Sequence, residues 1–438
     1  MERTWHKPLP PADLLIRGGR VVDPLSGVDA VQDVLVKRGK VAEVARSLAA
    51  PKGARVVDAD GMFVLPGFVD LHTHLRAPGR EDEEDVASGT RAAAAGGYVK
   101  VFAMANTEPV VDTAVVLRGL SETARAEAVV PAGFYGAVTR GLKGEQLTEM
   151  GELAEAGAVA FSDDGRPLAT AALVRRALQY AKVTGRVVAI HAQDDSLFKG
   201  GQMHEGPVSA RLGLGGIPSL CESLDVARAL DVAAYEGAPL HVHHISAAAT
   251  LEHLSRAKAA GLRVTAEATP HHLTMTDEAV ASLDSNLKMN PPLREEDDRQ
   301  ALVRALKAGL VDCIATDHAP HAPMSKDVPF EEAAFGTTGL ETAFAVLYTD
   351  LVKKRALDLG TLVTRMSQAP AAIAGVEPPA IRPGAVAELC VVDPRATWTV
   401  TAEGFESRSA NSAFLGRRLS GRVKLTVAAG RLAWEADA

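Results

Sequence analysis

Histidine and aspartate residues stand at the ends of several short apolar runs in the middle of the chain. His72 and His74 close the run at 67–75. Side chains two residues apart on an extended segment share one face, so both imidazoles point the same way. Further donors close four later runs: Asp163, Asp164, His191, His244 and Asp317. Imidazole and carboxylate are ligands that transition metals such as zinc take in proteins. The pattern therefore predicts a metal centre.

The runs themselves indicate the scaffold that positions these side chains. They alternate with helical stretches rich in Ala, Leu, Glu and Arg across residues 66–382, and they cover 67–75, 98–105, 128–138, 158–164, 186–192, 239–245, 262–270 and 312–318. Alternating strands and helices predict parallel βαβ units. Eight units fit a (β/α)8 TIM barrel, an α/β fold whose active site lies at the carboxyl ends of the strands. A doubly wound open sheet is the rival, but no Gly-rich phosphate loop follows the first run.

The two ends of the chain have a different sequence pattern. Residues 12–65 and 383–438 consist of short alternating apolar runs with turn signals, at Gly18-Gly19 and at Arg38-Gly39. Chain ends usually lie close together in a domain. We therefore predict one small β-sandwich domain formed by both termini, with the barrel inserted between them. Residues 1–11 are polar and Pro-rich, and we expect a loose arm there.

Composition narrows the possible functions. The 438 residues carry 47 Lys and Arg against 55 Asp and Glu, a net charge of −8, with 4% aromatic residues. Nucleic-acid binders are typically basic, so this partner is not expected. No apolar run has the length of a membrane span, and the N-terminus lacks the apolar segment of a signal peptide. Three dispersed cysteines without a C-x-x-C pair fit a reducing compartment, and we expect a cytoplasmic protein.

Several motifs, taken together, carry a family resemblance. GFVDLHTHLRAPG, FSDDG, AIHAQD, VTAEATPHHL, KMNPPLR and IATDHAPH occur in this order. The series resembles that of the cyclic amidohydrolases, and specifically class I dihydroorotase, over residues 14–434. The resemblance implies reversible cyclisation of N-carbamoyl-L-aspartate to L-dihydroorotate in de novo pyrimidine biosynthesis. It also implies a homodimer and, in some members, association with aspartate transcarbamoylase.

The resemblance further implies two zinc ions per subunit. His72, His74 and Asp317 would hold one ion, His191 and His244 the other, and Asp164 would bridge them. Strand parity alone places Asp163 and Asp164 on opposite faces and does not say which one reaches the metals. Metal availability also decides between zinc, cobalt and manganese.

Roles for the remaining site residues follow from chemistry and from the resemblance. Asp317 would act as general acid and base, passing a proton from a zinc-activated water to the ring nitrogen. Arg76, two residues after His74, would bind the substrate carboxylate bidentately. The family pattern adds further substrate contacts at Asn106, Asn290, His321, Phe335 and Gly336.

Two other classes of protein share parts of this sequence pattern. Hydantoinases and allantoinases generally carry a carbamylated lysine after the fourth strand, where AVAFSDDGRP has none. An inactive scaffold for aspartate transcarbamoylase would typically have lost several ligands. The loop at 325–339 is either a lid that closes over the substrate or a fixed connection. We expect His241 and His243 to face away from the barrel interior, and His204 to be solvated or to lie in a loop.

Overall fold

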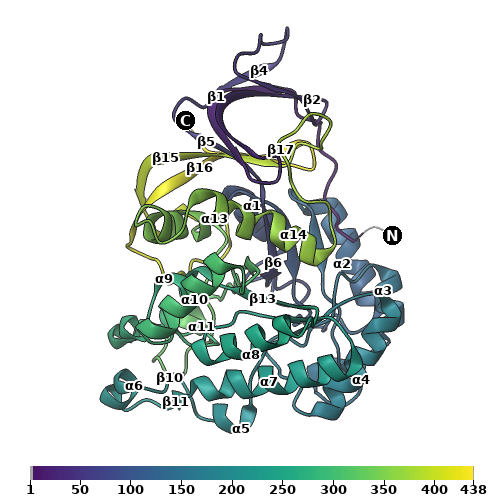
Figure 1. Cartoon of the computed structure of the whole chain (residues 1–438), viewed down its shortest axis with the longest axis vertical. Helices are drawn as coiled ribbons and strands as arrows, with labels where there is room; N and C mark the ends of the chain where they lie inside the picture. The colour runs from purple at the N-terminus through teal and green to yellow at the C-terminus, as the bar shows by residue number, and fades with distance from the viewer. Residues whose placement is uncertain (1–2, 438) are drawn as a thin grey trace.

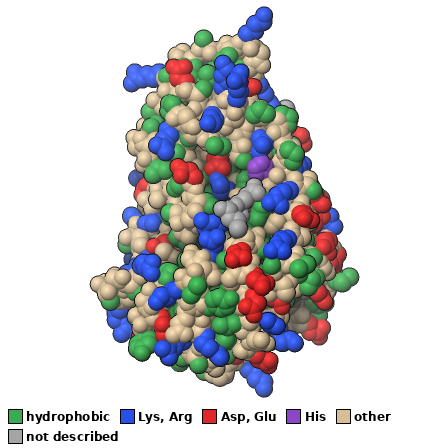
Figure 2. Space-filling model, turned by 90° about the vertical axis from the view of Figure 1, so that its right-hand side faces the viewer, with side chains coloured by type: hydrophobic (Ala, Val, Ile, Leu, Met, Phe, Trp, Pro, Cys, Tyr) green, Lys and Arg blue, Asp and Glu red, His purple; other side chains and the backbone are tan. Residues whose placement is uncertain are grey.

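The computed structural model describes residues 3–437 and is a mixed α/β structure. In Figure 1 a sheet built from the two ends of the chain lies above a larger body of helices and short strands. Basic and acidic side chains are interspersed over the face in Figure 2, which is the right-hand side of Figure 1. No helix among residues 3–437 is long and apolar enough to cross a membrane.

The upper sheet joins segments that are far apart in sequence. Its strands are β1 (Leu14–Asp23), β2 (Val28–Lys37), β3 (Lys40–Ala45), β4 (Arg55–Asp58), β5 (Phe63–Pro66), β15 (Leu389–Thr399), β16 (Arg418–Ala428) and β17 (Arg431–Glu435). The order is β17-β16-β15-β5-β1-β2-β3, and β4 pairs with β1. Antiparallel pairing of β15 with β5 connects the C-terminal strands to the N-terminal ones.

The two turn signals have different outcomes. Arg38 and Gly39 have φ of 51° and 74° and connect β2 to β3, so the hairpin predicted there is confirmed. Gly18-Gly19 makes no hairpin turn, because β1 continues through both residues with a register shift against β2. Gly18 has φ of 73°, the conformation in which glycine accommodates a bulge without a Cβ clash.

The body contains two parallel sheets. One has the order β6-β7-β8, from β6 (Phe68–Thr73), β7 (Tyr98–Ala103) and β8 (Ala132–Phe134). The other has the order β14-β13-β12-β9, from β9 (Val188–Ile190), β12 (Leu240–Val242), β13 (Val264–Ala268) and β14 (Cys313–Ile314). A pair of two-residue strands, β10 (Met203–His204) and β11 (Gly216–Ile217), forms a small separate sheet.

The expected run at 158–164 forms no regular strand. Instead, Phe161 makes isolated parallel bridges to Gly136 after β8 and to Val188 of β9. A further parallel bridge joins Thr73 of β6 to His318, which follows β14. Single bridges thus connect the two parallel sheets at both of their edges.

Helices lie between the strands of the body and after them. They are α1 (Val86–Ala95), α2 (Ala114–Glu127), α3 (Met150–Ala156), α4 (Ala171–Thr184), α5 (Asp195–Phe198), α6 (Pro207–Leu212), α7 (Ser219–Glu236), α8 (Ala248–Ala259), α9 (Pro270–Thr274), α10 (Glu296–Ala308), α11 (Pro323–Lys326), α12 (Ala343–Leu347), α13 (Leu359–Met366) and α14 (Gln368–Ala374). Local signals set their ends. The Thr170 side chain caps the start of α4, and Gly185 closes it with φ of 66°.

The N-terminal arm is not loose where it is described. Trp5 pairs with Ala132 of β8 through two backbone hydrogen bonds of 2.9 Å. Its ring is 2% exposed and stacks on Phe134 at a centroid distance of 5.9 Å. Burial of this aromatic surface outweighs the polar, Pro-rich composition that suggested a free segment. Residues 1–2 lie outside the described residues.

Candidate active site

Six of the predicted donors converge where the strands of the body end. His72 lies in β6 and His74 directly follows it, while His191 follows β9. His244 and Asp317 stand two and three residues beyond β12 and β14. The sixth, Asp164, follows the bridging segment at Phe161, and all six side chains are buried.

Asp164 lies at the centre of the cluster. Its Oδ1 is 3.4 Å from His72 Nε2, 3.4 Å from His244 Nε2 and 3.6 Å from His191 Nδ1. Its Oδ2 is 3.5 Å from His74 Nε2. One carboxylate therefore reaches imidazoles from both halves of the donor set.

Asp317 closes the other side of the cluster. Its Oδ1 is 3.0 Å from His74 Nε2 and 3.4 Å from His72 Nε2. On the opposite side, His191 Nδ1 is 2.9 Å from His244 Nε2. Two groups of donors thus flank Asp164, one with His72, His74 and Asp317 and one with the remaining two histidines.

The neighbouring aspartate points elsewhere. Asp163 Oδ1 accepts hydrogen bonds from the backbone amides of Val138 at 2.7 Å and Thr139 at 3.0 Å. These contacts turn Asp163 away from the histidines, so Asp164 is the member of the pair that faces the cluster. The alternation of side chains along a strand did not show which aspartate faces the histidines. The hydrogen bonds of Asp163 with the segment after β8 show it.

Backbone geometry at the cluster is unusual. Arg76, His244 and Asp317 have φ of 57°, 27° and 50°. Residues with a Cβ seldom adopt positive φ, and such strained positions gather at functional sites. At these positions the chain leaves the regular strand alternation, which lets adjacent side chains turn toward the same centre.

The donor set fits a metal ion. His72 Nε2 and Asp164 Oδ1 are buried without a hydrogen-bond partner among the described residues. Orphaned buried polar atoms are costly, and a cation accepts lone pairs from both. Nitrogen and carboxylate oxygen are donors that zinc binds. These residues could therefore hold a metal ion.

The electrostatics of the donor cluster also favour a cation at this position. Burial opposes ionisation of Asp164 and Asp317, but positive neighbours led by His72 outweigh it and hold the pKa of both carboxyls below their usual range. Burial likewise opposes protonation of His72, yet Asp164 and Asp317 raise its pKa well above the usual value. Asp164 and Asp317 thus stabilise a positive charge that lies between them.

A cavity of about 520 Å³ opens onto this cluster. Its lining contains every predicted metal ligand except His72, together with all six predicted substrate contacts: Arg76, Asn106, Asn290, His321, Phe335 and Gly336. It also contains residues that sequence reasoning did not assign: Arg166, Gln193 and Lys199. The cavity therefore brings the donor cluster and the candidate substrate contacts together.

Arg76 is held in place by several groups. Its Nε donates to the carbonyl of Pro320 at 3.0 Å and lies 3.3 Å from Glu83 Oε2. Burial lowers the pKa of Arg76 to about 10, which keeps the guanidinium charged at neutral pH. Glu83 Oε1 also lies 3.4 Å from His321 Nδ1, so one buried carboxylate orients two candidate substrate contacts.

Amide side chains connect the donors to the cavity. The ring nitrogen Nδ1 of His74 lies 2.9 Å from Asn106 Oδ1. On the other side, Gln193 Oε1 is 3.2 Å from His191 Nε2 and accepts from Asn290 Nδ2 at 2.8 Å. Gln193 stands two residues after His191 in AIHAQD, and this spacing is the signal that could have identified it.

The loop at 325–339 is anchored by buried lysines. Lys326 Nζ donates to the carbonyl of Ser285 at 2.9 Å. Lys288 Nζ lies 4.7 Å from the ring centroid of Phe335, a cation–π contact beneath the cavity wall. These contacts join the loop to the segment at 285–288.

Two expectations about other histidines are wrong. His241 and His243 do not face outward, since both contact Glu267 and the His243 ring centroid is 4.4 Å from that of His72. His204 is not solvated but 6% exposed, and its Nδ1 accepts a hydrogen bond from Arg294.

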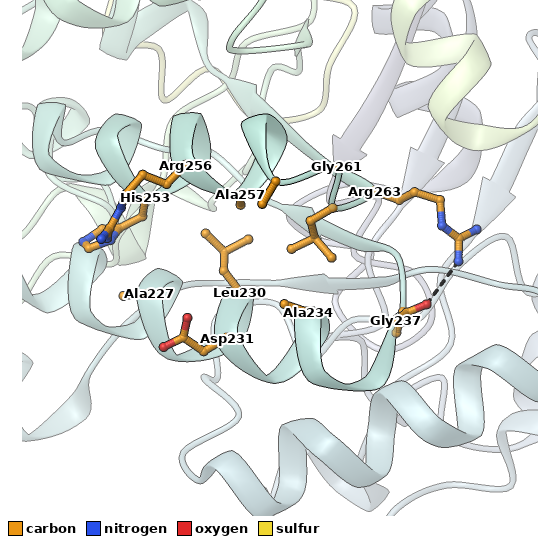
Figure 3. A pocket seen from close by; sticks show the side chains of 13 residues that line it. Ala227, Leu230, Asp231, Ala234, Gly237, His253, Arg256, Ala257, Gly261 and Arg263 are labelled. Atoms are coloured by element: carbon orange, nitrogen blue, oxygen red, sulfur yellow. Dashed lines mark hydrogen bonds between the residues drawn. The ribbon is translucent and has the colours of Figure 1, made fainter.

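A second cavity, of about 550 Å³, lies between α7 and α8. Figure 3 shows Asp231 on one side facing His253 and Arg256 on the other. Apolar residues such as Leu230 form its floor, and Arg263 donates to the Gly237 carbonyl at its end. None of the predicted site residues lines this cavity, so the candidate chemistry stays with the cavity over the histidine cluster.

Comparison with known proteins shows the family to which the chain belongs. A family model described as dihydro-orotase-like matches residues 61–250, the part of the chain that contains five of the six donors. A dihydroorotase from Geobacter metallireducens is 47% identical over 423 residues, covering 97% of this chain and 100% of the relative. The chain belongs to the dihydroorotase family. A second family member, from Anaeromyxobacter dehalogenans, is 47% identical over 97% of this chain and 98% of its own length.

Solved structures extend the likeness beyond the dihydroorotase family. An L-hydantoinase (dihydropyrimidinase) from Arthrobacter aurescens has a TM-score of 0.85 at 26% identity, covering 97% of this chain and 98% of its own. A dihydropyrimidinase from Brevibacillus agri has a TM-score of 0.82 at 25% identity, covering 96% and 94%. The chain therefore shares its overall structure with these hydantoinases and dihydropyrimidinases.

Proposed function

We propose that this chain is a dihydroorotase, which interconverts L-dihydroorotate and N-carbamoyl-L-aspartate in de novo pyrimidine biosynthesis. The observation that carries this proposal is the cavity whose lining combines five of the six clustered donors with a buried arginine, Arg76. Hydrolysis of the ring amide requires an activated water near the carbonyl, and the carboxylate on the ring requires a cation. The cavity offers groups suited to both tasks.

The donor cluster is proposed to hold two zinc ions. His72, His74 and Asp317 would bind one, His191 and His244 the other, and the central Asp164 would bridge them. Support comes from the contacts of Asp164 with all four histidines within 3.6 Å. When bound, the ions supply Lewis acidity for the amide carbonyl and lower the pKa of water.

Asp317 is the proposed general acid and base. Support comes from its position, since Asp317 lines the cavity and contacts the donor histidines His72 and His74. In ring opening Asp317 would take that proton and deliver it to the leaving ring nitrogen. In ring closure it would remove the proton from the carbamoyl nitrogen.

Recognition of the substrate carboxylate is assigned to Arg76. Its planar guanidinium can donate two parallel hydrogen bonds to a carboxylate. Asn106, Asn290, His321 and the backbone at 335–336 are proposed to complete the contacts with the ring and the carboxylate. All of these residues line the same cavity.

Local charge explains how an acidic protein attracts an anion. The chain carries a net charge of −8, which repels dihydroorotate and the dianionic carbamoyl-aspartate at long range. The cavity nevertheless has Arg76, Arg166 and Lys199 in its lining. We assign the attraction to these groups and to the metal ions, since screening weakens the field of distant surface charges.

Two alternatives are less well supported. A hydantoinase or allantoinase has a carbamylated lysine in the bridging position, where this chain has Asp164 within 3.6 Å of the histidines. Those activities also do not need the ring carboxylate that Arg76 fits. An inactive scaffold for aspartate transcarbamoylase has no need of six converging donors.

The architecture proposed around this site is a (β/α)8 barrel over residues 66–382. The parallel bridges of Phe161 and of Thr73 with His318 support closure of the two parallel sheets into one ring. The terminal segments 12–65 and 383–438 would form the small β-sandwich domain. A cytoplasmic location is also proposed, in keeping with three buried free cysteines, and the family resemblance leads us to propose a homodimer. Sedimentation of the protein alone and with aspartate transcarbamoylase would test its assembly.

The experiment that tests the function is a zinc assay combined with turnover. Purified protein loaded with two equivalents of zinc should open dihydroorotate and leave hydantoin and allantoin nearly untouched. Because opening the ring releases one proton, the ratio of open to cyclic form should rise with pH. Faster turnover of hydantoin or allantoin than of dihydroorotate would contradict the proposal.

A further inference from the structure

Glu267 of β13 is a buried carboxylate beneath the donor cluster with an unusual set of partners. Its Oε1 lies 2.8 Å from His72 Nδ1 and 2.9 Å from His243 Nδ1. Its Oε2 lies 3.0 Å from His241 Nε2. The Glu267 side chain is fully buried, so three imidazoles converge on one carboxylate away from water.

The protons of this network can be assigned from the remaining contacts. An ionised carboxylate only accepts hydrogen bonds, so each of the three ring nitrogens facing Glu267 must carry a proton. The far nitrogen of His241 then accepts from the Thr265 hydroxyl at 2.8 Å, and that of His243 accepts from Ser162 at 3.2 Å. Each hydroxyl has the proton that this arrangement requires.

The third imidazole, His72, differs from His241 and His243 at the ring nitrogen that faces away from Glu267. Its far nitrogen, Nε2, has no hydrogen-bond partner among the described residues and points at Asp164 and Asp317. With the proton held at Nδ1 by Glu267, the lone pair is left at Nε2. That is the state in which an imidazole binds a metal ion.

We propose that Glu267 is a positioning residue that fixes the tautomer and the ring orientation of His72 for metal binding. The inference rests on the proposed two-metal site. It assigns a role to the glutamate of VTAEATP and to the histidines at 241 and 243, none of which contacts the cavity. His241, His243 and the backbone amide of His244 also donate to Glu267 and thereby hold its carboxylate in place.

A matched control exists on α7. Glu222 is 2% exposed and also accepts several hydrogen bonds, from the Ser246 and Ala247 amides and from the Thr250 hydroxyl. None of its partners is a proposed metal ligand. Glu222→Gln therefore reports the general cost of replacing a buried, fully bonded carboxylate.

The test measures zinc affinity directly, by competition with a chelator, in wild type, Glu267→Gln and Glu222→Gln. We expect Glu267→Gln to weaken one of the two zinc sites about 10- to 100-fold, the usual effect of losing such a partner, and Glu222→Gln to leave both sites unchanged. Equal affinities in wild type and Glu267→Gln would overturn the inference while leaving the proposed function intact. A wild type without zinc would contradict the proposed function and the inference with it.

A second measurement does not depend on the variant folding. In zinc-loaded wild type labelled with ¹⁵N-histidine, the His72 ring should carry its proton at Nδ1. A proton at Nε2 of His72 would overturn the inference.

His243→Gln should keep both zinc sites, because Glu267 still accepts from His72. A zinc equivalent lost in that variant would instead mean that the Glu267 cluster binds metal itself.

Discussion

Replacing Arg76 with alanine should separate substrate binding from metal binding. The side chain lines the cavity but contacts none of the six proposed metal ligands through a hydrogen bond, and its partners are Pro320, Glu83 and His321. Removing it takes away the guanidinium that would pair with the carboxylate of dihydroorotate. The donor cluster is left in place, so zinc content should stay at two per chain.

The magnitude follows from the contact that is lost. Two charge-assisted hydrogen bonds at about 1.5 kcal/mol each amount to about 3 kcal/mol. At 1.36 kcal/mol per decade, that lowers kcat/KM by roughly 100-fold. The ring carboxylate is bound alike before and during the reaction, so we expect the loss mainly as a higher KM. Glu83 then keeps Arg80 and His321 as partners but loses the charge of Arg76, so Arg76→Ala with Glu83→Gln should recover part of the loss.

Steady-state kinetics of ring opening, with zinc analysis of the same samples, provides the assay. Arg80→Ala is the matched control, since Arg80 also pairs with Glu83 but does not line the cavity. It should leave KM within a few fold of wild type. An unchanged KM in Arg76→Ala, or loss of zinc from that variant, would refute the reasoning.

Three further predictions concern the acid–base group, the N-terminal arm and the pH dependence of stability. Asp317→Asn should keep an oxygen ligand but lower kcat by about 10²- to 10⁴-fold, and near-normal kcat would exclude the proposed proton transfer. Trp5→Ala should lower the free energy of unfolding by about 3 kcal/mol in urea titrations with KM unchanged, and an unaltered midpoint would mean that the arm does not dock. Burial and nearby Arg294 lower the pKa of His204 to about 4, against about 6.5 when unfolded. Between these values the unfolded state binds more protons, so stability falls on acidification, and His204→Gln should flatten that fall by up to about 1.4 kcal/mol per pH unit. A slope equal to wild type would contradict the assignment.

The positions of the metal donors were predictable because strand ends and period-two alternation constrain them. His72 and His74 share a face for that reason, and the helical stretches between runs indicate that the run ends meet at one edge. The sequence did not show which of Asp163 and Asp164 faces the donor cluster, because the hydrogen bonds that turn Asp163 away come from the amides of residues 138 and 139. Long-range contacts of this kind leave no local signal in the sequence.

The alternation rule also misleads where a strand ends. β12 stops at Val242, and His244 has φ of 27°, so the direction of the His244 side chain does not tell which face of the strand points inward. His241 and His243 share a face, as alternation requires, and both contact Glu267, whereas His244 contacts Asp164 from beyond the strand end. Glu267 acts through His72, which is far away in sequence, and that is why motif spacing did not indicate it.

A crystal structure of the zinc-loaded protein with dihydroorotate tests the central claim most directly. Anomalous scattering at the zinc edge should give two peaks on either side of Asp164, one near His72 and His74 and one near His191 and His244. The substrate carboxylate should lie against Arg76. A single peak, ions bound elsewhere, or a substrate carboxylate that avoids Arg76 would contradict the account.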